Sequence, residues 1–115
     1  VLWFKQHDPT INTVSVEQLQ QWLEQSVPFV LIDVRNGFEY EAGNMGADLM
    51  PLDQIETYVD RIPRDQKVII HCKGGARSER AVQLLQDKYG YKNLFNLKGG
   101  ILAWKEKYQP ELPVV

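Results

Sequence analysis

The sequence has 115 residues, 43% hydrophobic and 24% charged, which is the composition of one folded domain rather than of a disordered chain. Its net charge of −2 excludes a general nucleic-acid-binding role, because such proteins need a basic face. No apolar run approaches the roughly 18 residues of a membrane-spanning helix. The single cysteine cannot form an internal disulfide, so we expect a cytoplasmic protein, and the start at Val1 rather than Met indicates a piece of a longer chain.

Patterns typical of helices and of strands alternate along the chain. Ser15 and Gln18 form a capping-box pattern that opens a helix. Pro28 precedes an apolar run over 29–32 that predicts a strand ending at Asp33. The other predicted elements are, in chain order, a short strand near 47–50, a helix over 52–61, a strand from Lys67, a helix from Ser78 to Gly90, a strand over 93–97 and a helix over 101–108.

This alternation predicts an α/β fold in which helices cover both faces of a parallel sheet. We expect one domain over residues 13–113, an N-terminal extension over 1–12 and a tail at 114–115. Ligands of open α/β sheets bind beyond the carboxyl ends of the strands. Asp33 and Cys72 both follow predicted strands, so the sequence places them at that edge.

The only cysteine stands between a β-branched strand and a glycine loop. Gly74 and Gly75 allow the backbone to turn with its amides pointing inward. A thiol that faces amides and a helix N-terminus ionises more readily than a free cysteine. We therefore predict that Cys72 is a nucleophile rather than a structural core cysteine. The predicted substrate-binding residues follow it directly and are Lys73, Gly74, Gly75, Ala76, Arg77 and Ser78.

Three segments carry a resemblance to a known family. The loop from Cys72 to Ser78 resembles the active-site loop of single-domain rhodaneses, sulfurtransferases that carry a persulfide on cysteine. The other two segments are similar to further signatures of that family and read Asp33-Val34-Arg35 with Glu39-Tyr40 and Gly43, and Leu97-Lys98-Gly99-Gly100-Ile101-Leu102-Ala103-Trp104. The resemblance implies a three-layer rhodanese-like fold with a five-stranded parallel sheet.

The same resemblance implies a reaction. Cys72 takes sulfane sulfur from thiosulfate or a protein persulfide and passes it to a thiol, cyanide, thioredoxin or a sulfur-carrier protein, without a cofactor. Lys73 and Arg77 would orient the donor, with Arg80 completing a basic rim. The two histidines, His7 and His71, and the one cysteine are together too dispersed along the sequence to give a metal-site spacing.

Supporting roles are expected for residues around the nucleophile. Asp33 would brace the cysteine loop or pair with a basic side chain, and Arg35 would pair with Glu39. His71 should point away from Cys72, because neighbouring strand residues face opposite sides. The glycine pair at 99–100 would let the chain turn closely past the sheet, and Trp104 would fill the core.

One segment departs from the family pattern. The family usually continues Gly-His-Ile-Pro-Gly-Ala where this chain reads Gly43-Asn44-Met45-Gly46-Ala47. This difference predicts a shorter route from the second strand to the third, with a changed loop geometry.

Two other functions stay open. The sequence His71-Cys72…Arg77 resembles the loop of rhodanese-fold cysteine phosphatases and arsenate reductases, but those enzymes place five residues between cysteine and arginine where this chain has four. Alternatively, the chain is a non-catalytic docking module of a larger protein, although the retained cysteine counts against this. The loop also resembles rhodanese domains fused to sulfur-carrier adenylyltransferases.

Overall fold

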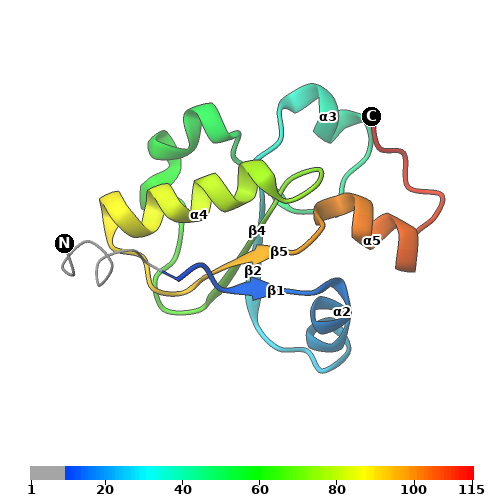
Figure 1. Cartoon of the computed structure of the whole chain (residues 1–115), viewed down its shortest axis with the longest axis horizontal. Coiled ribbons are helices and arrows are strands. Elements are labelled where there is room, and N and C mark those ends of the chain that lie inside the picture. The colour runs from blue at the N-terminus through cyan, green and yellow to red at the C-terminus, as the bar shows by residue number, and fades with distance from the viewer. Residues whose placement is uncertain (1–9) are drawn as a thin grey trace.

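The computed structural model describes residues 10–115 and contains a five-stranded sheet, all parallel, in the order β1-β5-β4-β2-β3 (Figure 1). This confirms the predicted α/β fold with five parallel strands. The strands are β1 (Thr13–Val14), β2 (Phe29–Asp33), β3 (Asp48–Leu49), β4 (Lys67–His71) and β5 (Leu94–Leu97).

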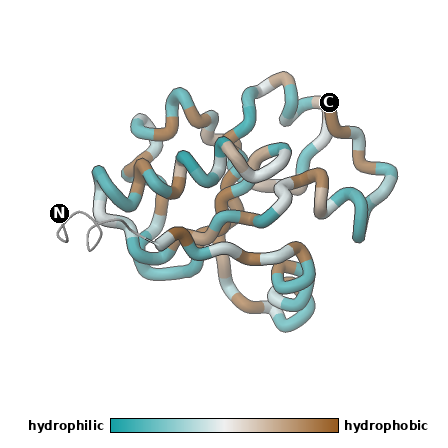
Figure 2. The backbone as a smooth tube through the Cα atoms, in the orientation of Figure 1, coloured by the Kyte–Doolittle hydropathy of each residue, from teal (hydrophilic) through white to brown (hydrophobic). Residues whose placement is uncertain are grey.

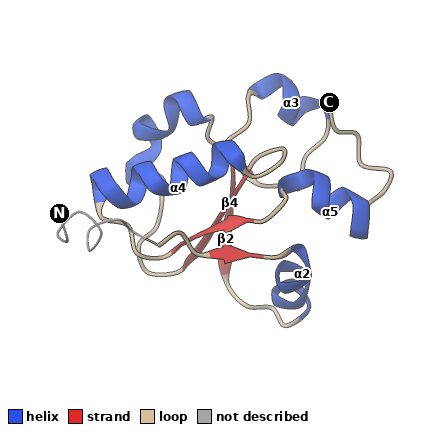
Figure 3. Cartoon of the chain, in the orientation of Figure 1, coloured by secondary structure: helices blue, strands red, loops and turns tan. Residues whose placement is uncertain are grey.

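The helices lie on both sides of this sheet (Figure 3). They are α2 (Val16–Glu24), α3 (Gly37–Ala42), the 3-10 helix η1 (Leu52–Arg61), α4 (Ala76–Tyr89) and α5 (Gly100–Tyr108). None of these described helices is long and apolar enough to cross a membrane.

The side-chain alternation of β4 divides the core into two layers. Val68 and Ile70 pack in a cluster with residues of η1 and α4, whereas Ile69 packs with residues of α2 and α5. All three side chains are fully buried, as expected of a central parallel strand covered on both faces. The hydrophobic stretches at the centre of Figure 2 follow these strands. The sheet therefore fixes where the residues after β4 emerge.

Most predicted elements are present, with differences at their ends. Ser15 caps α2 and accepts a hydrogen bond from the Gln18 amide at 3.0 Å, but the Gln18 side chain donates to Gln21, so only half of the expected capping box forms. The helix expected from Ser78 begins earlier, at Ala76, and ends as predicted at Gly90. Strand β1 and helix α3 were not predicted, because both are short.

The first turn of α5 packs directly on the backbone that follows β4. The amides of Ile101 and Leu102 donate to the carbonyls of Cys72 and Lys73 at 3.0 and 3.1 Å. Gly100 makes this contact possible, since a Cβ there would lie 2.4 Å from the Lys73 oxygen. The glycine pair at 99–100 thus allows a close turn, as expected, but the backbone that it approaches is that of the cysteine loop.

We predict that Gly100→Ala destabilises the domain more than Gly46→Ala. Both glycines have positive φ, +60° and +78°, but a Cβ at Gly46 would meet nothing within 4 Å. The two substitutions share the conformational cost, and only Gly100→Ala adds a clash, which costs about 1–3 kcal/mol more. Urea denaturation measures the difference, and equal losses for the two variants would contradict the close packing of α5 on the loop.

Candidate functional site

Cys72 lies where β4 ends, and its sulfur is surrounded by the loop that follows. Its Sγ accepts hydrogen bonds from the amides of Gly75 at 3.1 Å and Ser78 at 3.4 Å, and lies 3.3 Å from the Ser78 hydroxyl. Cys72 is only 1% exposed. The loop and the N-terminus of α4 therefore aim their donors at one sulfur atom.

The backbone conformation that aims these donors depends on Gly75. It is the N-terminal cap of α4 and has a φ of +112°, a region that favours glycine. Its amide donates to the sulfur, and its carbonyl accepts from the Glu79 amide in the first helical turn. The glycine predicted from the sequence to bend the loop thus also starts the helix.

These contacts decide how readily the thiol ionises. Burial acts to raise the pKa of Cys72, but the hydrogen bonds from Ser78, Gly75 and the Arg77 backbone outweigh it and lower the pKa below the ordinary value of a thiol. A lowered pKa makes more thiolate, the reactive form of cysteine. The geometry supports the prediction of a nucleophile at this position.

Behind the sulfur, Ser78 and Asn96 form a buried polar pair. The Ser78 hydroxyl lies 2.5 Å from Asn96 Oδ1 and 3.2 Å from the Gly75 carbonyl, to which Asn96 Nδ2 also donates. Asn96 is 5% exposed and comes from β5. Sequence reasoning missed it, although a polar residue within the apolar run Leu94–Leu97 is a visible signal.

Arg77 does not stand free beside the sulfur. Its guanidinium makes a two-pronged ion pair with Glu39 of α3, at 2.7 and 3.0 Å. The hydrogen bond from Arg77 lowers the pKa of Glu39 to about 2, with help from the backbone of Asn36. Asn36 and Glu39 form a complete capping box on α3, which the sequence analysis overlooked.

Arg35 therefore has a different partner from the one predicted. It pairs with Asp33, at 2.7 Å between Arg35 Nη2 and Asp33 Oδ2, and also donates to the Gly43 carbonyl at 2.9 Å. The prediction of an Arg35–Glu39 pair was wrong, because both Asp33 and Arg35 are fully buried and neutralise each other locally. Of the two roles expected for Asp33, the structure shows the pairing with a basic side chain.

His71 is fully buried beside the same pair. Its Nε2 lies 3.6 Å from Asp33 Oδ2, and its Nδ1 lies 3.2 Å from the Cys72 carbonyl oxygen. Burial lowers the pKa of His71 despite the nearby Asp33. Its polar contacts go to the backbone of Cys72 and to Asp33, so its ring supports the strand end.

Two openings flank the loop. One is lined by residues 74–76 together with Asn96 and Lys98, and the other, of about 410 Å³, by Arg77, Arg80 and Asn36 among others. The second opening brings together two members of the expected basic rim. Lys73 is half-buried in the same loop.

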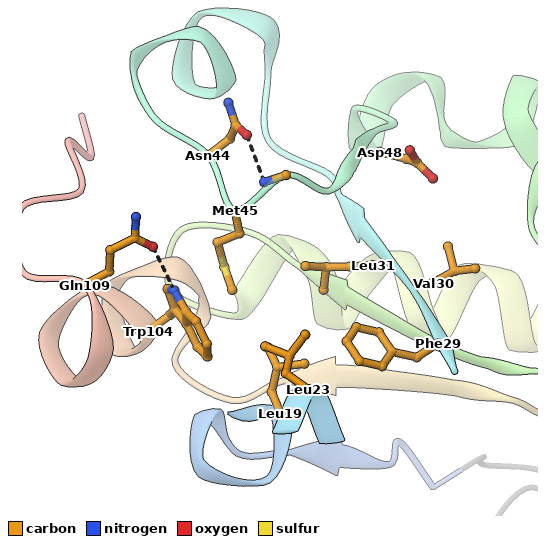
Figure 4. A pocket seen from close by; sticks show the side chains of 11 residues that line it. Leu19, Leu23, Phe29, Val30, Leu31, Asn44, Met45, Asp48, Trp104 and Gln109 are labelled. Atoms are coloured by element: carbon orange, nitrogen blue, oxygen red, sulfur yellow. Dashed lines mark hydrogen bonds between the residues drawn. The ribbon is translucent and has the colours of Figure 1, made fainter. Parts of the chain in front are cut away.

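A larger pocket lies away from the cysteine loop, between α2, β2 and α5 (Figure 4). Most of its lining residues are apolar, including Leu19, Phe29, Met45 and Trp104, and polar side chains such as Asp48 and Gln109 line it as well. Asn44, in the segment that departs from the family pattern, accepts from the Gly46 amide at 2.9 Å and lines this pocket. The altered segment thus contributes to this apolar pocket. Trp104 is largely buried, as predicted.

No group of three or more metal-ligating side chains occurs within residues 10–115. His7 lies outside the described residues.

Comparison with known proteins relates this site to a family. The sequence model of the rhodanese-like domain matches residues 15–107. A sulfurtransferase of Allochromatium vinosum is 36% identical over 95 residues, which cover 82% of this chain and 88% of that protein. The crystal structure of a rhodanese-like domain protein from Staphylococcus aureus superposes with a TM-score of 0.77 at 26% identity, covering 91% of this chain and 99% of that one.

Other relatives are longer. A tRNA uridine(34) hydroxylase of Bdellovibrio bacteriovorus is 38% identical over 92 residues, and a probable adenylyltransferase/sulfurtransferase MoeZ of Mycobacterium tuberculosis is 32% identical over 104. The matches cover 75% and 88% of this chain. In each case they span only 26% of the relative's length.

We predict that the free energy of unfolding of Glu39→Gln falls less than that of the wild type as the pH is lowered from 7 to 3. Because the pKa of Glu39 is about 2 in the folded state and ordinarily 4.5, its contribution is complete above pH 4.5 and is lost as the pH falls toward 2. That contribution is at most roughly 3 kcal/mol. Urea denaturation between pH 7 and pH 3 measures it.

Glu17→Gln is the matched control, since Glu17 pairs with Lys107 at an exposed position where solvent screens the interaction. Its pH dependence should stay close to that of the wild type. If Glu39→Gln follows the wild-type slope as well, the Arg77–Glu39 pair contributes nothing to folding in solution.

Proposed function

Because the chain belongs to the rhodanese-like domain family, we propose that it is a sulfurtransferase that carries a persulfide on Cys72. The observation that carries this proposal is the convergence of two amides and a hydroxyl on the Cys72 sulfur. The two amide donors already point at the sulfur atom and stabilise negative charge there without rearranging. The thiolate carries its charge on Sγ itself, whereas the persulfide carries it on the outer sulfur, one bond further from Cys72.

The proposed reaction has two displacement steps. The Cys72 thiolate attacks the outer sulfur of thiosulfate, a sulfur–sulfur bond forms, and sulfite leaves with the electron pair of the bond that breaks. An acceptor nucleophile then attacks the outer persulfide sulfur, and Cys72 leaves as the thiolate. The enzyme returns to its starting state, and both displacements balance in atoms and electrons without a cofactor.

The loop cations have separate roles in this scheme. Arg77 is held by Glu39 and is 31% exposed, so it fixes the rim of the site and still presents positive charge to solvent. Lys73 precedes the glycine pair on the same loop. We assign Lys73, with the amides of Gly74 and Ala76, to the binding of the anionic donor.

The chemistry of a cysteine persulfide limits the classes of physiological donor and acceptor. A protein persulfide or thiosulfate would supply the sulfur, and a thiol, thioredoxin or sulfur-carrier protein would take it. The name of the Mycobacterium relative supports a role beside an adenylyltransferase, whereas the sulfurtransferase of Allochromatium matches along most of its length. A cytoplasmic location suits a protein with one reactive thiol.

We predict that thiosulfate adds the mass of one sulfur atom to the wild type and none to Cys72→Ser. Cyanide should remove the added sulfur, since it takes the outer atom of a persulfide. Intact-mass spectrometry measures both changes. Wild-type protein blocked beforehand with iodoacetamide is the control, because Cys72 is the only cysteine.

A different outcome would replace the proposal. If no sulfur is gained but a chromogenic aryl phosphate is cleaved by the wild type and not by Cys72→Ser, the chain is a cysteine phosphatase. If Cys72 is inert toward thiosulfate, toward a protein persulfide and toward the phosphate ester, the domain binds without catalysing.

A further inference from the structure

The Ser78 hydroxyl has one proton and three neighbours that could accept it. These are Cys72 Sγ at 3.3 Å, the Gly75 carbonyl at 3.2 Å and Asn96 Oδ1 at 2.5 Å. The Asn96 contact is the shortest, and an amide oxygen carries no proton of its own. The hydroxyl proton therefore lies on the line to Asn96.

The orientation of the Asn96 amide is fixed by its other end. Nδ2 donates to the Gly75 carbonyl at 3.2 Å, and the opposite orientation would set two oxygens against each other there. Gly75 keeps its helical bond from the Glu79 amide in either case. Asn96 thus presents an acceptor to Ser78 because the loop backbone requires its donor.

We propose that Asn96 is a positioning residue that holds the Ser78 hydroxyl away from the sulfur while Cys72 is a thiol and yields it when the sulfur carries charge. In the thiol state, S–H donates to Ser78 Oγ, and Ser78 O–H donates to Asn96. When a base in the solvent takes the thiol proton, Ser78 keeps its own proton and turns its O–H toward the sulfur. Asn96 then loses its donor, which opposes ionisation.

This arrangement predicts that substitutions of Asn96 and of Ser78 shift the ionisation of the Cys72 thiol in opposite directions. Without the Asn96 oxygen, only the longer contact to the Gly75 carbonyl competes with the thiolate for the Ser78 proton, so the thiol ionises more readily. Without the Ser78 hydroxyl, the thiolate loses a donor and the thiol ionises less readily. Asn96 makes no hydrogen bond to the sulfur in the described structure, so the proposed effect passes through Ser78, and its second contact, to the Gly75 carbonyl, is what the double variant tests separately.

Several other charged or titratable groups lie around the sulfur. Those facing it from the neighbouring elements, or bonded to its loop, are Lys73, Arg77 and Glu79 beyond β4, His71 within it, Asp33 at the end of β2, Arg35 after β2, Glu39 of α3 and Lys98 after β5. The lowered pKa values of Glu39 and His71 keep both from changing charge above pH 7.

The test is the pH dependence of Cys72 alkylation by iodoacetamide, checked by the ultraviolet absorbance of the thiolate. Asn96→Ala and Asn96→Leu should each lower the pKa of Cys72 by about 0.5 to 1, the worth of one neutral hydrogen bond. Ser78→Ala should raise it. Asn96→Asp keeps an acceptor for Ser78 and adds a negative charge, so it should raise the pKa too.

A double variant distinguishes a positioning role of Asn96 from a general loosening of the loop. Asn96→Ala in the Ser78→Ala background should leave the pKa where Ser78→Ala put it. A loop that had merely loosened would lose its amide donors and show a raised pKa for every Asn96 variant, which would overturn the proposal. Asn44→Ala, which removes an amide from the distant apolar pocket, is the control and should not move the pKa.

The role of Asn96 concerns the ionisation of Cys72. It rests on the proposed function only for the reaction in which the ionised sulfur is used. Alkylation needs no sulfur donor, so the two proposals fail separately. If the variants shift the pKa as predicted while thiosulfate adds no sulfur, Asn96 positions the Ser78 hydroxyl beside a cysteine with another reaction. An unchanged pKa in a wild type that does accept sulfur rejects the role of Asn96 alone.

Discussion

The contact between the first turn of α5 and the loop after β4 is the constraint on which the rest of the site depends. Two amides of α5 bind the carbonyls of Cys72 and Lys73, and this is possible only because Gly100 has no side chain. With those carbonyls turned toward α5, the following amides face the sulfur. The backbone shape that activates Cys72 is therefore held from outside the loop, by a segment almost thirty residues further along the chain.

A second support reaches the site from the opposite side, through α3. Arg35 is buried with Asp33 before this helix, and its Nη2, which pairs with Asp33, also donates to the carbonyl of Gly43 directly after the helix. The buried guanidinium thus ties both ends of a six-residue helix. A short helix has little stability of its own, so this tie and the capping box together place Glu39 where it meets Arg77. Buried charge here serves to position a surface ion pair.

The sequence allowed the local part of this arrangement to be predicted and left the tertiary part hidden. Cys72, the glycine turn and the helix after it follow one another in the chain, so their relation is visible in the residue order. Arg35 and Glu39 are spaced like a helical ion pair, yet α3 begins only at Gly37, and Arg35 precedes it. The true partner of Glu39 lies 38 residues away, in the first turn of α4, and only the tertiary fold brings the two side chains together. Asn96 was missed for the same reason, since its role depends on β5 lying beside β4.

The reactivity of Cys72 depends both on residues that contact its sulfur and on residues that hold those contacts in place. The atoms that touch the sulfur come from a stretch of seven residues, but those that hold this stretch in shape come from α3, β5 and α5. Without them, the Gly75 amide and the Ser78 hydroxyl would be free to bind water, and the thiol would ionise as in an unfolded chain. A buried sulfur also cannot draw on solvent to stabilise its charge, so it depends on these fixed donors more than an exposed thiol would. The reactivity of Cys72 is thus a property of the whole parallel sheet and its covering helices, expressed at one atom.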